Sequence, residues 1–367
     1  MSGPDTKKTP LHEVHEGLGA TVTEFAGYQM PLRYGSETAE HQAVRTSAGL
    51  FDLSHMGEIF LTGPQAGAAL DHALIGHLSA LAVGRARYTM ICDKRGHVLD
   101  DLIVYRLASE TFMVVANAAN AAVVLSELVK RSEGFEKATV DNRSDAYALI
   151  AVQGPKAQSI LEKLTDAALA DLKYYAILPG SVAGVDALIA RTGYTGEDGF
   201  ELFVSAGDAV SVWRSLTEAG GEDLRPCGLS ARDTLRLEAG MPLYGNELTA
   251  ETTPYDAGLG RTIKFEKGDF VGRAALAALA DTTPERVLVG LVARGRRVPR
   301  HGYDIVGSDG TPCGVVTSGA PSPTLGKPIA MGYIDAGHAE DTDLAVDIRG
   351  KHEPVDKVAL PFYRRTP

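Results

Sequence analysis

Residues 98–105, Val-Leu-Asp-Asp-Leu-Ile-Val-Tyr, place two adjacent aspartates inside an otherwise apolar run. Such a run is typical of a buried strand, and the side chains of a strand alternate between its two faces. We therefore expect Asp100 and Asp101 on opposite faces, and their apolar neighbours indicate that both faces are buried. Because an unpaired buried carboxylate is costly, at least one of the two should have a partner or a chemical role.

The segments around this strand predict a mixed α+β fold. Residues 11–50 have the pattern of a helix followed by loops, with a short helix over 39–48. Beyond them, strand patterns occupy 59–61, 111–116 and 147–153, and helical patterns occupy 66–74, 120–131 and 157–164.

The last part of the chain has a different pattern of residues. From about residue 285, short strands are separated by Gly and Pro, which predicts a small β-sandwich or barrel. A linker rich in Ala, Asp, Thr and Pro precedes these strands and predicts a domain boundary near residue 280.

Composition excludes several classes of protein. The 367 residues contain no run of about 18 apolar residues, which a membrane-spanning helix needs. The net charge of −11 argues against nucleic-acid binding, which requires a basic surface. The N-terminus lacks the apolar stretch of a secretory signal, and the three cysteines are far apart, so we expect a cytoplasmic protein with reduced thiols.

Two arginine clusters interrupt the acidic trend. One consists of Arg294, Arg296, Arg297 and Arg300, and the other is the pair at 364–365. Each cluster is either a set of solvated loop side chains or a site that captures an anion, and the pattern alone leaves both interpretations open.

Residues 191–204, Arg-Thr-Gly-Tyr-Thr-Gly-Glu-Asp-Gly-Phe-Glu-Leu-Phe-Val, predict a tight turn between two strands. On the second strand, Glu201 and Phe203 face away from the apolar side. Glu201 is therefore either a strand-edge glutamate or another buried acid. The segment is no phosphate loop, because it lacks the GxxxxGK[ST] spacing and its own acids would repel phosphate.

Arg232 stands in the first turn of a predicted helix, where the helix dipole disfavours a cation. It also lies four residues before Arg236, a like-charge pair. An arginine placed against both preferences is expected either to meet an anion from elsewhere or to form an ordinary tertiary ion pair.

The remaining reactive residues indicate neither a metal site nor a nucleophile. The pairs His12/His15 and His72/His77 have no third ligand nearby, so we expect no bound metal. His55 is expected to pack or to form hydrogen bonds. Because a GxSxG elbow and a Cys/His constellation are both missing, any chemistry depends on carboxylates, arginines and tyrosines.

Six motifs, taken in order, resemble the aminomethyltransferase family, the T-protein of the glycine cleavage system. They are Thr9-Pro-Leu-His with Phe25–Pro31, Phe51-Asp-Leu-Ser-His-Met-Gly57, Leu99-Asp-Asp-Leu102, Gly193–Glu201, Ala231–Glu238 and Thr253-Pro-Tyr-Asp256. The resemblance runs from about residue 9 to the end of the chain.

The resemblance implies a three-domain, cloverleaf-like arrangement around a central folate cleft. Residues 1–50 and 145–280 would form a discontinuous folate-binding α+β domain, 51–144 an inserted α+β domain, and 281–367 a β-rich domain. Members of this family take the aminomethyl group from the lipoyl arm of the H-protein. They transfer its carbon to tetrahydrofolate and release ammonia, so lipoylated H-protein and tetrahydrofolate are the implied partners.

The resemblance also implies the site residues. Asp101 corresponds to the family's catalytic aspartate. The folate pocket is carried over at Met56, Tyr88, Val115, Tyr194, Glu201, Arg232, Arg300 and Tyr363. Many members of the family have a tryptophan where this chain has Arg261, so the resemblance assigns no pocket role to that position.

Three alternatives compete with this assignment. A non-catalytic folate-binding paralogue of the iron–sulfur-repair type would carry a cysteine motif near 193–199, where this chain has none. A folate-dependent demethylase of the same fold usually follows a flavin domain, and we expect none here. A purely structural protein would leave the buried acids and Arg232 unexplained.

Overall fold

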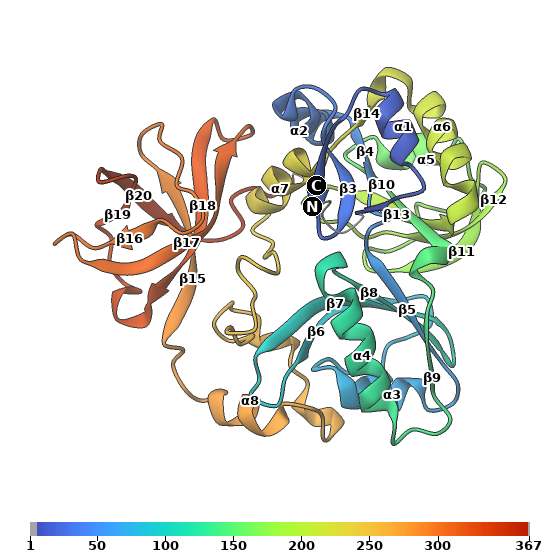
Figure 1. The fold of residues 1–367 in the computed structure, drawn as a ribbon, viewed down its shortest axis with the longest axis horizontal. Coiled ribbons are helices and arrows are strands. Elements are labelled where there is room, and N and C mark those ends of the chain that lie inside the picture. The colour runs from blue at the N-terminus through green and yellow to red at the C-terminus, as the bar shows by residue number, and fades with distance from the viewer. Residues whose placement is uncertain (1–5, 366–367) are drawn as a thin grey trace, which may run out of the picture. The chain divides into compact units, whose positions relative to one another are not determined.

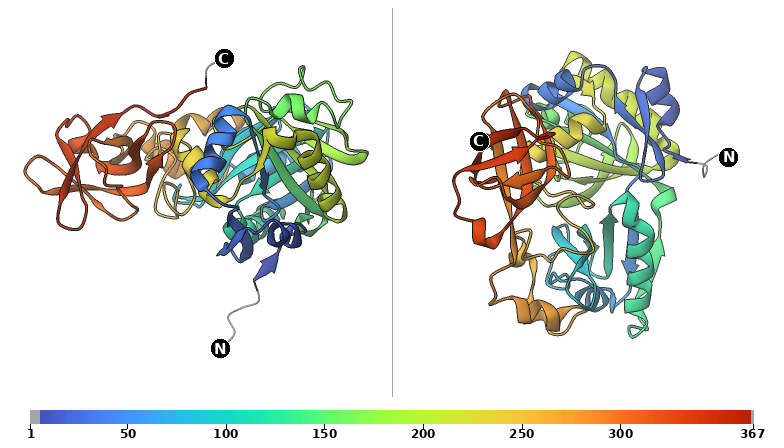
Figure 2. Two further views of the ribbon diagram at one scale, coloured as in Figure 1. Left: turned by 90° about the horizontal axis from the view of Figure 1, so that it is seen from above. Right: turned by 60° about the vertical axis from the view of Figure 1, so that its left-hand side comes forward.

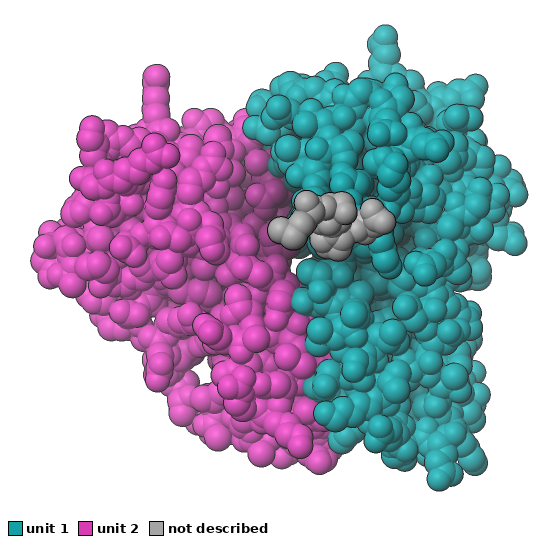
Figure 3. All heavy atoms as spheres, in the orientation of Figure 1, with its two compact units in different colours: residues 1–73, 77–89, 102–232 teal, residues 74–76, 90–101, 233–367 magenta. Residues whose placement is uncertain are grey.

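The computed structural model describes residues 6–365 and divides into two compact units. Unit 1 comprises residues 1–73, 77–89 and 102–232, and unit 2 comprises 74–76, 90–101 and 233–367 (Figure 3). Among the described residues, no helix is both long and apolar enough to cross a membrane.

The largest sheet of unit 1 has six strands in the order β11-β12-β13-β10-β4-β14 (Figure 1). Helices α5 (Ala157–Leu161) and α6 (Ala209–Gly220) pack on the face that carries Ile150 and Leu202, and the only tryptophan, Trp213, is buried there. The strands are β4 (Ala48–Asp52), β10 (Tyr147–Gln153), β11 (Ile177–Val182), β12 (Val185–Ala190), β13 (Gly199–Ser205) and β14 (Leu224–Pro226). The other face of the sheet therefore remains for the site described below.

The N-terminal segment contains a three-stranded sheet that the helix-and-loop prediction for 11–50 misses. Its elements are β1 (Lys7–Lys8), α1 (His12–Gly17), β2 (Thr21–Phe25), β3 (Tyr28–Arg33) and α2 (Glu37–Thr46). The β2–β3 turn uses Ala26 and Gly27, both with positive φ (51° and 82°). Two positive φ angles suit a tight hairpin, but alanine at the first position hides the usual Asn-Gly signal.

A five-stranded sheet has the order β6-β7-β8-β5-β9 and packs with helices α3 (Ala66–Ala73) and α4 (Ala121–Ser132). Its strands are β5 (Gly57–Thr62), β6 (Ala86–Cys92), β7 (Val98–Ala108), β8 (Thr111–Ala116) and β9 (Thr139–Asn142). In β7 the two aspartates do point to opposite faces. Asp100 is fully buried, but Asp101 is only half-buried, as is Ile103 on the same face, so the expectation of two buried faces is wrong.

The C-terminal strands of unit 2 form a closed barrel, β15-β18-β17-β16-β19-β20, which decides between the sandwich and barrel alternatives (Figure 2). The strands are β15 (Arg286–Ala293), β16 (Asp304–Val306), β17 (Pro312–Ser322), β18 (Lys327–Asp335), β19 (Leu344–Asp347) and β20 (His352–Val358), and α8 (Arg273–Leu279) precedes them. The sequence did not predict β20, because Pro354 and its alternating polar residues weaken the strand pattern. The predicted α+β class and barrel are confirmed.

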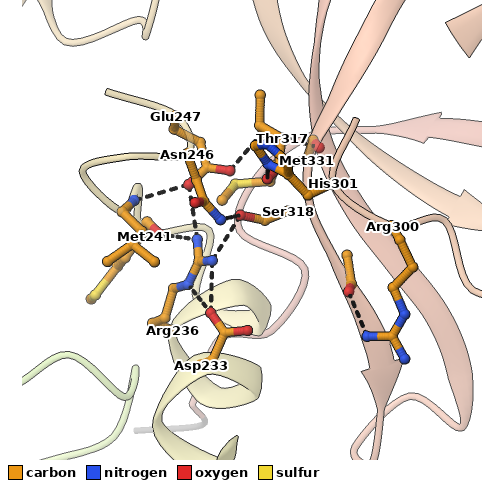
Figure 4. Close-up of polar contacts among 12 residues, drawn as sticks. Asp233, Arg236, Met241, Asn246, Glu247, Arg300, His301, Thr317, Ser318 and Met331 are labelled. Atoms are coloured by element: carbon orange, nitrogen blue, oxygen red, sulfur yellow. Dashed lines mark hydrogen bonds and ion pairs between the residues drawn. The ribbon is translucent and has the colours of Figure 1, made fainter. Parts of the chain in front are cut away.

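The end of helix α7 (Leu229–Glu238) is joined to the barrel by a buried polar network (Figure 4). Arg236 donates to Glu247 at 2.9 Å, to Ser318 at 2.7 Å and to Asp233 at 2.8 Å, and Thr317 donates to the other oxygen of Glu247 at 2.6 Å. The side chains of Arg236 and Glu247 are 1% and 0% exposed. Because both charges are desolvated, each depends on the other.

Replacing Glu247 by Ala is expected to destabilise unit 2 by about 3–5 kcal/mol, because it leaves the Arg236 guanidinium buried without its main partner. Urea denaturation followed by circular dichroism measures the change. The matched control is Asp356→Ala, which removes the half-exposed Arg294–Asp356 pair of the same barrel. That variant should lose less than about 1 kcal/mol. Equal losses in the two variants would contradict the role of the buried pair.

Candidate functional site

Glu201 of β13 is a buried carboxylate with two donors on one oxygen. The residue is 8% exposed and lies on the sheet face opposite α5 and α6. Thr192 Oγ1 donates a short hydrogen bond to its Oε2, and the Tyr105 hydroxyl donates to the same oxygen at 3.3 Å. Among residues 6–365, no group donates a hydrogen bond to Oε1 of Glu201. This oxygen is available to a ligand.

Burial and the neighbouring side chains have opposite effects on the pKa of Glu201. Burial raises the pKa of the Glu201 carboxyl, while the bonds from Thr192 and Tyr105 and the positive charge of Arg232 act in the opposite direction. Burial and the charge of Glu201 in turn raise the pKa of Tyr105 well above its usual range. Tyr105 therefore stays protonated and remains a donor.

Arg232 and Tyr194, two further predicted site residues, lie beside this carboxylate. The guanidinium carbon of Arg232 stands 4.8 Å from the centre of the Tyr194 ring, a cation–π arrangement. Its charge acts on both Glu201 and His55. Structure thus brings together Tyr194, Glu201 and Arg232, and Arg232 does meet the field of an acid from another element.

The turn before Met56 is held by a buried aspartate. Asp52 accepts hydrogen bonds from Thr9 Oγ1 at 2.7 Å, from His15 Nε2 at 2.9 Å and from the Ser54 amide at 2.9 Å. Burial opposes ionisation of Asp52, but His15 and Ser54 hold the pKa of this carboxyl below its usual value. The network orders the residues that lead into β5, and Met56 lies half-buried immediately before that strand.

His55, in the same turn, is buried against Phe25 and Tyr28, with ring centroids 5.6 and 6.4 Å away. Burial and the positive charge of Arg232 lower the pKa of His55 to about 4, so the imidazole is neutral at physiological pH. The expectation that His55 packs is confirmed.

Val115, another predicted pocket residue, lies on the same face of the five-stranded sheet as Tyr105, the residue that donates to Glu201. It pairs with Glu58 on one side and with Ile103 on the other. Tyr105, two residues beyond Ile103 and on the same face of β7, donates to Glu201. Tyr88 is half-buried on β6.

The predicted site residues of unit 2 lie on different elements. Half-buried Asp101 is on β7, and exposed Arg300 donates to the Gly319 carbonyl at 3.3 Å (Figure 4). The Tyr363 amide donates to the Glu238 carbonyl at the end of α7. Arg261 is exposed.

Sequence reasoning missed three residues that shape these sites. Tyr105 and Thr192 donate hydrogen bonds to Glu201. Tyr244 is subject to the charges of Asp100 and Asp101. The Tyr244 hydroxyl donates to the Val98 carbonyl at 3.3 Å, and burial with the charges of Asp100 and Asp101 raises its pKa. Strand alternation could have indicated Tyr105, but Tyr244 comes from a remote segment without a local signal.

Comparisons with known proteins agree along the whole chain. The family model described as "GCVT N-terminal domain" matches residues 11–267, and the one described as "Glycine cleavage T-protein C-terminal barrel domain" matches 286–364. The aminomethyltransferase of Streptomyces avermitilis is 65% identical and that of Saccharopolyspora erythraea 64% identical, each with 100% of both chains covered.

A solved structure agrees as well. The glycine cleavage system aminomethyltransferase T from Bartonella henselae matches with a TM-score of 0.92 and 38% identity, and 98% of each chain is covered. The resemblance inferred from the six motifs is thus confirmed. The chain belongs to the aminomethyltransferase family, the T-proteins of the glycine cleavage system.

Proposed function

We propose that this chain transfers the aminomethyl carbon from the lipoyl arm of the H-protein to tetrahydrofolate, giving 5,10-methylenetetrahydrofolate and ammonia. Membership of an enzyme family with this activity supports the assignment. The observation in the chain itself that carries it is Glu201, a buried carboxylate with one oxygen open to a ligand.

Glu201 suits the edge of a pterin ring. That edge presents two parallel N–H donors in an amidine-like arrangement, and a carboxylate accepts such a pair well. Oε2 is held by Tyr105 and Thr192, which fixes the plane of the carboxylate, so Oε1 is presented in a defined direction. Tyr194 and Tyr88 provide aromatic faces for the ring.

The other binding roles follow from side-chain chemistry. Met56 and Val115 would supply an apolar wall against the pterin. Arg232 and Arg300 would provide guanidinium groups for anionic parts of the folate, whose glutamate tail carries carboxylates. Tyr363 would close the site from the C-terminal segment.

Asp101 is the residue we assign to the reaction. Transfer breaks the carbon–nitrogen and carbon–sulfur bonds of the aminomethyl group and forms two bonds to folate nitrogens. The two protons lost by those nitrogens leave with ammonia and with the lipoyl thiol. A carboxylate is suited to position the amine, to stabilise the cationic iminium that forms as ammonia leaves, and to hold a proton. Half-buried Asp101 is open enough to act in this way.

The remaining assignments complete the proposal. The reaction uses no metal ion, and its partners are lipoylated H-protein and tetrahydrofolate in the cytoplasm. We retain the domains predicted from the sequence: 1–50 with 145–280, 51–144, and 281–367. Residues 1–5 and 366–367 of these ranges lie outside the described residues.

An ammonia-release assay tests the proposed function. Aminomethylated H-protein is mixed with the full chain, with and without tetrahydrofolate. Release that requires both folate and the chain is expected. Absence of folate-dependent release with an authentic H-protein would refute the assignment and favour a demethylase of the same fold.

Replacing Asp101 by Asn should leave tetrahydrofolate binding intact and lower turnover by about 10²–10⁴-fold, because the neutral amide neither stabilises a cation nor takes a proton. The ammonia-release rate and the folate Kd from calorimetry measure the two effects. Asp304→Asn, at an exposed barrel position, is the matched control and should match the unmodified chain. Near-normal turnover of the Asp101 variant would overturn the role of this residue.

Replacing Arg232 by Ala should weaken tetrahydrofolate binding roughly ten- to a hundredfold, because a charge-assisted contact is lost. Calorimetry measures the change. Arg232→Lys keeps the charge but not the planar group above Tyr194, and should have an intermediate affinity. Arg214→Ala, an exposed helical arginine, should bind normally. Unchanged affinity in the Arg232→Ala variant would contradict the proposal.

Folate affinity should fall on acidification at a higher pH than an ordinary glutamate would cause. Burial raises the pKa of Glu201, so its acceptor oxygens are lost as the pH falls through that raised value. Calorimetric Kd values over a pH series measure this. Glu201→Gln should bind more weakly, and its affinity should lack this acid limb. The same pH profile in both proteins would show that Glu201 does not contact the pterin.

A further inference from the structure

Glu58, on β5, is a buried carboxyl group to which the proposed reaction gives no role. It is 1% exposed. Its backbone is satisfied, because the amide donates to Ser144 Oγ at 3.0 Å and the carbonyl accepts from the Arg143 amide at 2.9 Å. Its side chain is not satisfied, because among the described residues Oε1 has no hydrogen-bond partner and no cation pairs with the carboxyl. Native proteins leave few buried polar atoms without a partner, so this one indicates a ligand.

The protonation state of Glu58 differs from that of an ordinary glutamate. Burial raises the pKa of the Glu58 carboxyl well above its usual range, and only its own amide opposes this effect. Burial therefore favours the neutral form, and a neutral carboxyl has an O–H donor that a carboxylate lacks. At Glu201, by contrast, hydroxyl donors and the charge of Arg232 support the charged form. The two glutamates thus offer a ligand different groups.

The Glu58 side chain lies on the face of the five-stranded sheet that carries predicted pocket residues. Glu58 is directly opposite Val115 in the β5–β8 pair, and Val115 is opposite Ile103 of β7, so these side chains share one face. The other face belongs to the helices, since a Cβ on Gly57 would stand 2.7 Å from the Cβ of Ala121 on α4. Glu58 therefore points away from α4 and toward the side of the candidate site.

This face of β5 is closed at one end. Phe60, two residues after Glu58, is buried and stacks on the Tyr147 ring with centroids 5.7 Å apart. Toward the other end, Ile103 and Met56 are only half-buried. A ligand is therefore expected to approach Glu58 from the end where Met56 lies, which is where we assign the pterin.

We propose that Glu58 is a further folate-binding residue, which donates a hydrogen bond from its neutral carboxyl to the ring carbonyl of the pterin. The inference rests on the proposed function. The pterin has both kinds of group: its amidine-like edge donates, which suits a carboxylate, and its ring carbonyl accepts, which suits an O–H donor. Because the protein covers Oε1, contact requires a side chain to shift, and the unbranched Met56 is suited to do so.

A purely structural carboxyl is the competing interpretation, and the cost of burial disfavours it. A polar group without a partner in the interior destabilises the folded chain, and an apolar side chain of similar size would remove that cost. Residues that lower stability in this way are typical of binding sites, where the ligand supplies the missing partner. Replacement of Glu58 by an apolar residue should therefore weaken folate binding without destabilising the protein.

Three variants of the full chain test the inference through calorimetric Kd values for tetrahydrofolate and melting temperatures. Glu58→Leu should bind about three- to tenfold more weakly, because one uncharged hydrogen bond is lost, and should melt no lower than the unmodified chain. Glu58→Gln keeps an N–H donor and should bind within about twofold of the unmodified chain. Ser132→Ala, the matched control, removes a buried hydroxyl of α4 that also lacks a partner among the described residues, and should leave the Kd unchanged.

Infrared difference spectroscopy tests the donor directly and does not depend on the fold of the Leu variant. The carbonyl stretch of a protonated carboxyl should shift when tetrahydrofolate binds to the unmodified chain. Glu58→Gln should lack this change. A shift that persists in Glu58→Gln would assign the band to another carboxyl and contradict the inference.

The affinities separate the remaining outcomes. Unchanged folate affinity in Glu58→Leu would overturn the inference and make Glu58 a structural group. Equal losses in the Leu and Gln variants would show that Glu58 binds as a carboxylate, which would also overturn it. Weaker binding by Glu58→Leu, without ammonia release by the unmodified chain, would refute the proposed reaction and leave Glu58 a folate-binding residue, so the two failures are distinguishable.

Discussion

The site depends on keeping one carboxylate charged inside a protein. Glu201 is desolvated by the sheet that carries it, and burial alone would favour its neutral form. Two hydroxyl donors and a guanidinium from separate segments partly offset the lost water: Tyr105 from β7, Thr192 from the turn after β12, and Arg232 from the start of α7. Folding is therefore coupled to assembly of the binding group, because the charge is tolerated only where these segments meet.

Other buried charged groups of the protein are likewise stabilised by hydrogen-bond or ion-pair partners. Asp52 is fully buried and is satisfied by three donors, which orders the turn before Met56. In unit 2, Arg236 and Glu247 are buried together and join α7 to β17. Glu58 is a buried carboxyl group that lacks such partners. One of its oxygens lacks a partner among the described residues, and burial raises the pKa of the Glu58 carboxyl well above the usual range, which favours its neutral form. Buried charges persist here only where partners are complete.

Sequence patterns correctly predicted the features that depend on residues close together in the sequence. Strand alternation separated Asp100 from Asp101, and the dipole argument identified Arg232 as an arginine that needs an acid. The half-exposure of Asp101 depends on what covers the strand, which no local pattern encodes. Tyr244 could not be anticipated for the same reason, because its hydrogen bond to the Val98 carbonyl joins segments more than a hundred residues apart.

The prediction of secondary structure failed where the local sequence signals were atypical. The β2–β3 hairpin has Ala26 at the first turn position, where Asn or Gly is usual, and Pro354 weakens the pattern of β20 although the barrel needs that strand to close. Closure of the barrel supplies the pairing partners that override the local preference. Tertiary context thus decided the elements that propensity alone misassigned.

The most direct measurement of the central claim is a crystal structure of the chain with tetrahydrofolate bound. The account predicts that the amidine-like edge of the pterin donates hydrogen bonds to Glu201, with Oε1 as one acceptor, and that the ring lies against Tyr194. A pterin ring bound away from Glu201, or a Glu201 carboxylate that still contacts only Tyr105 and Thr192 in the complex, would contradict it.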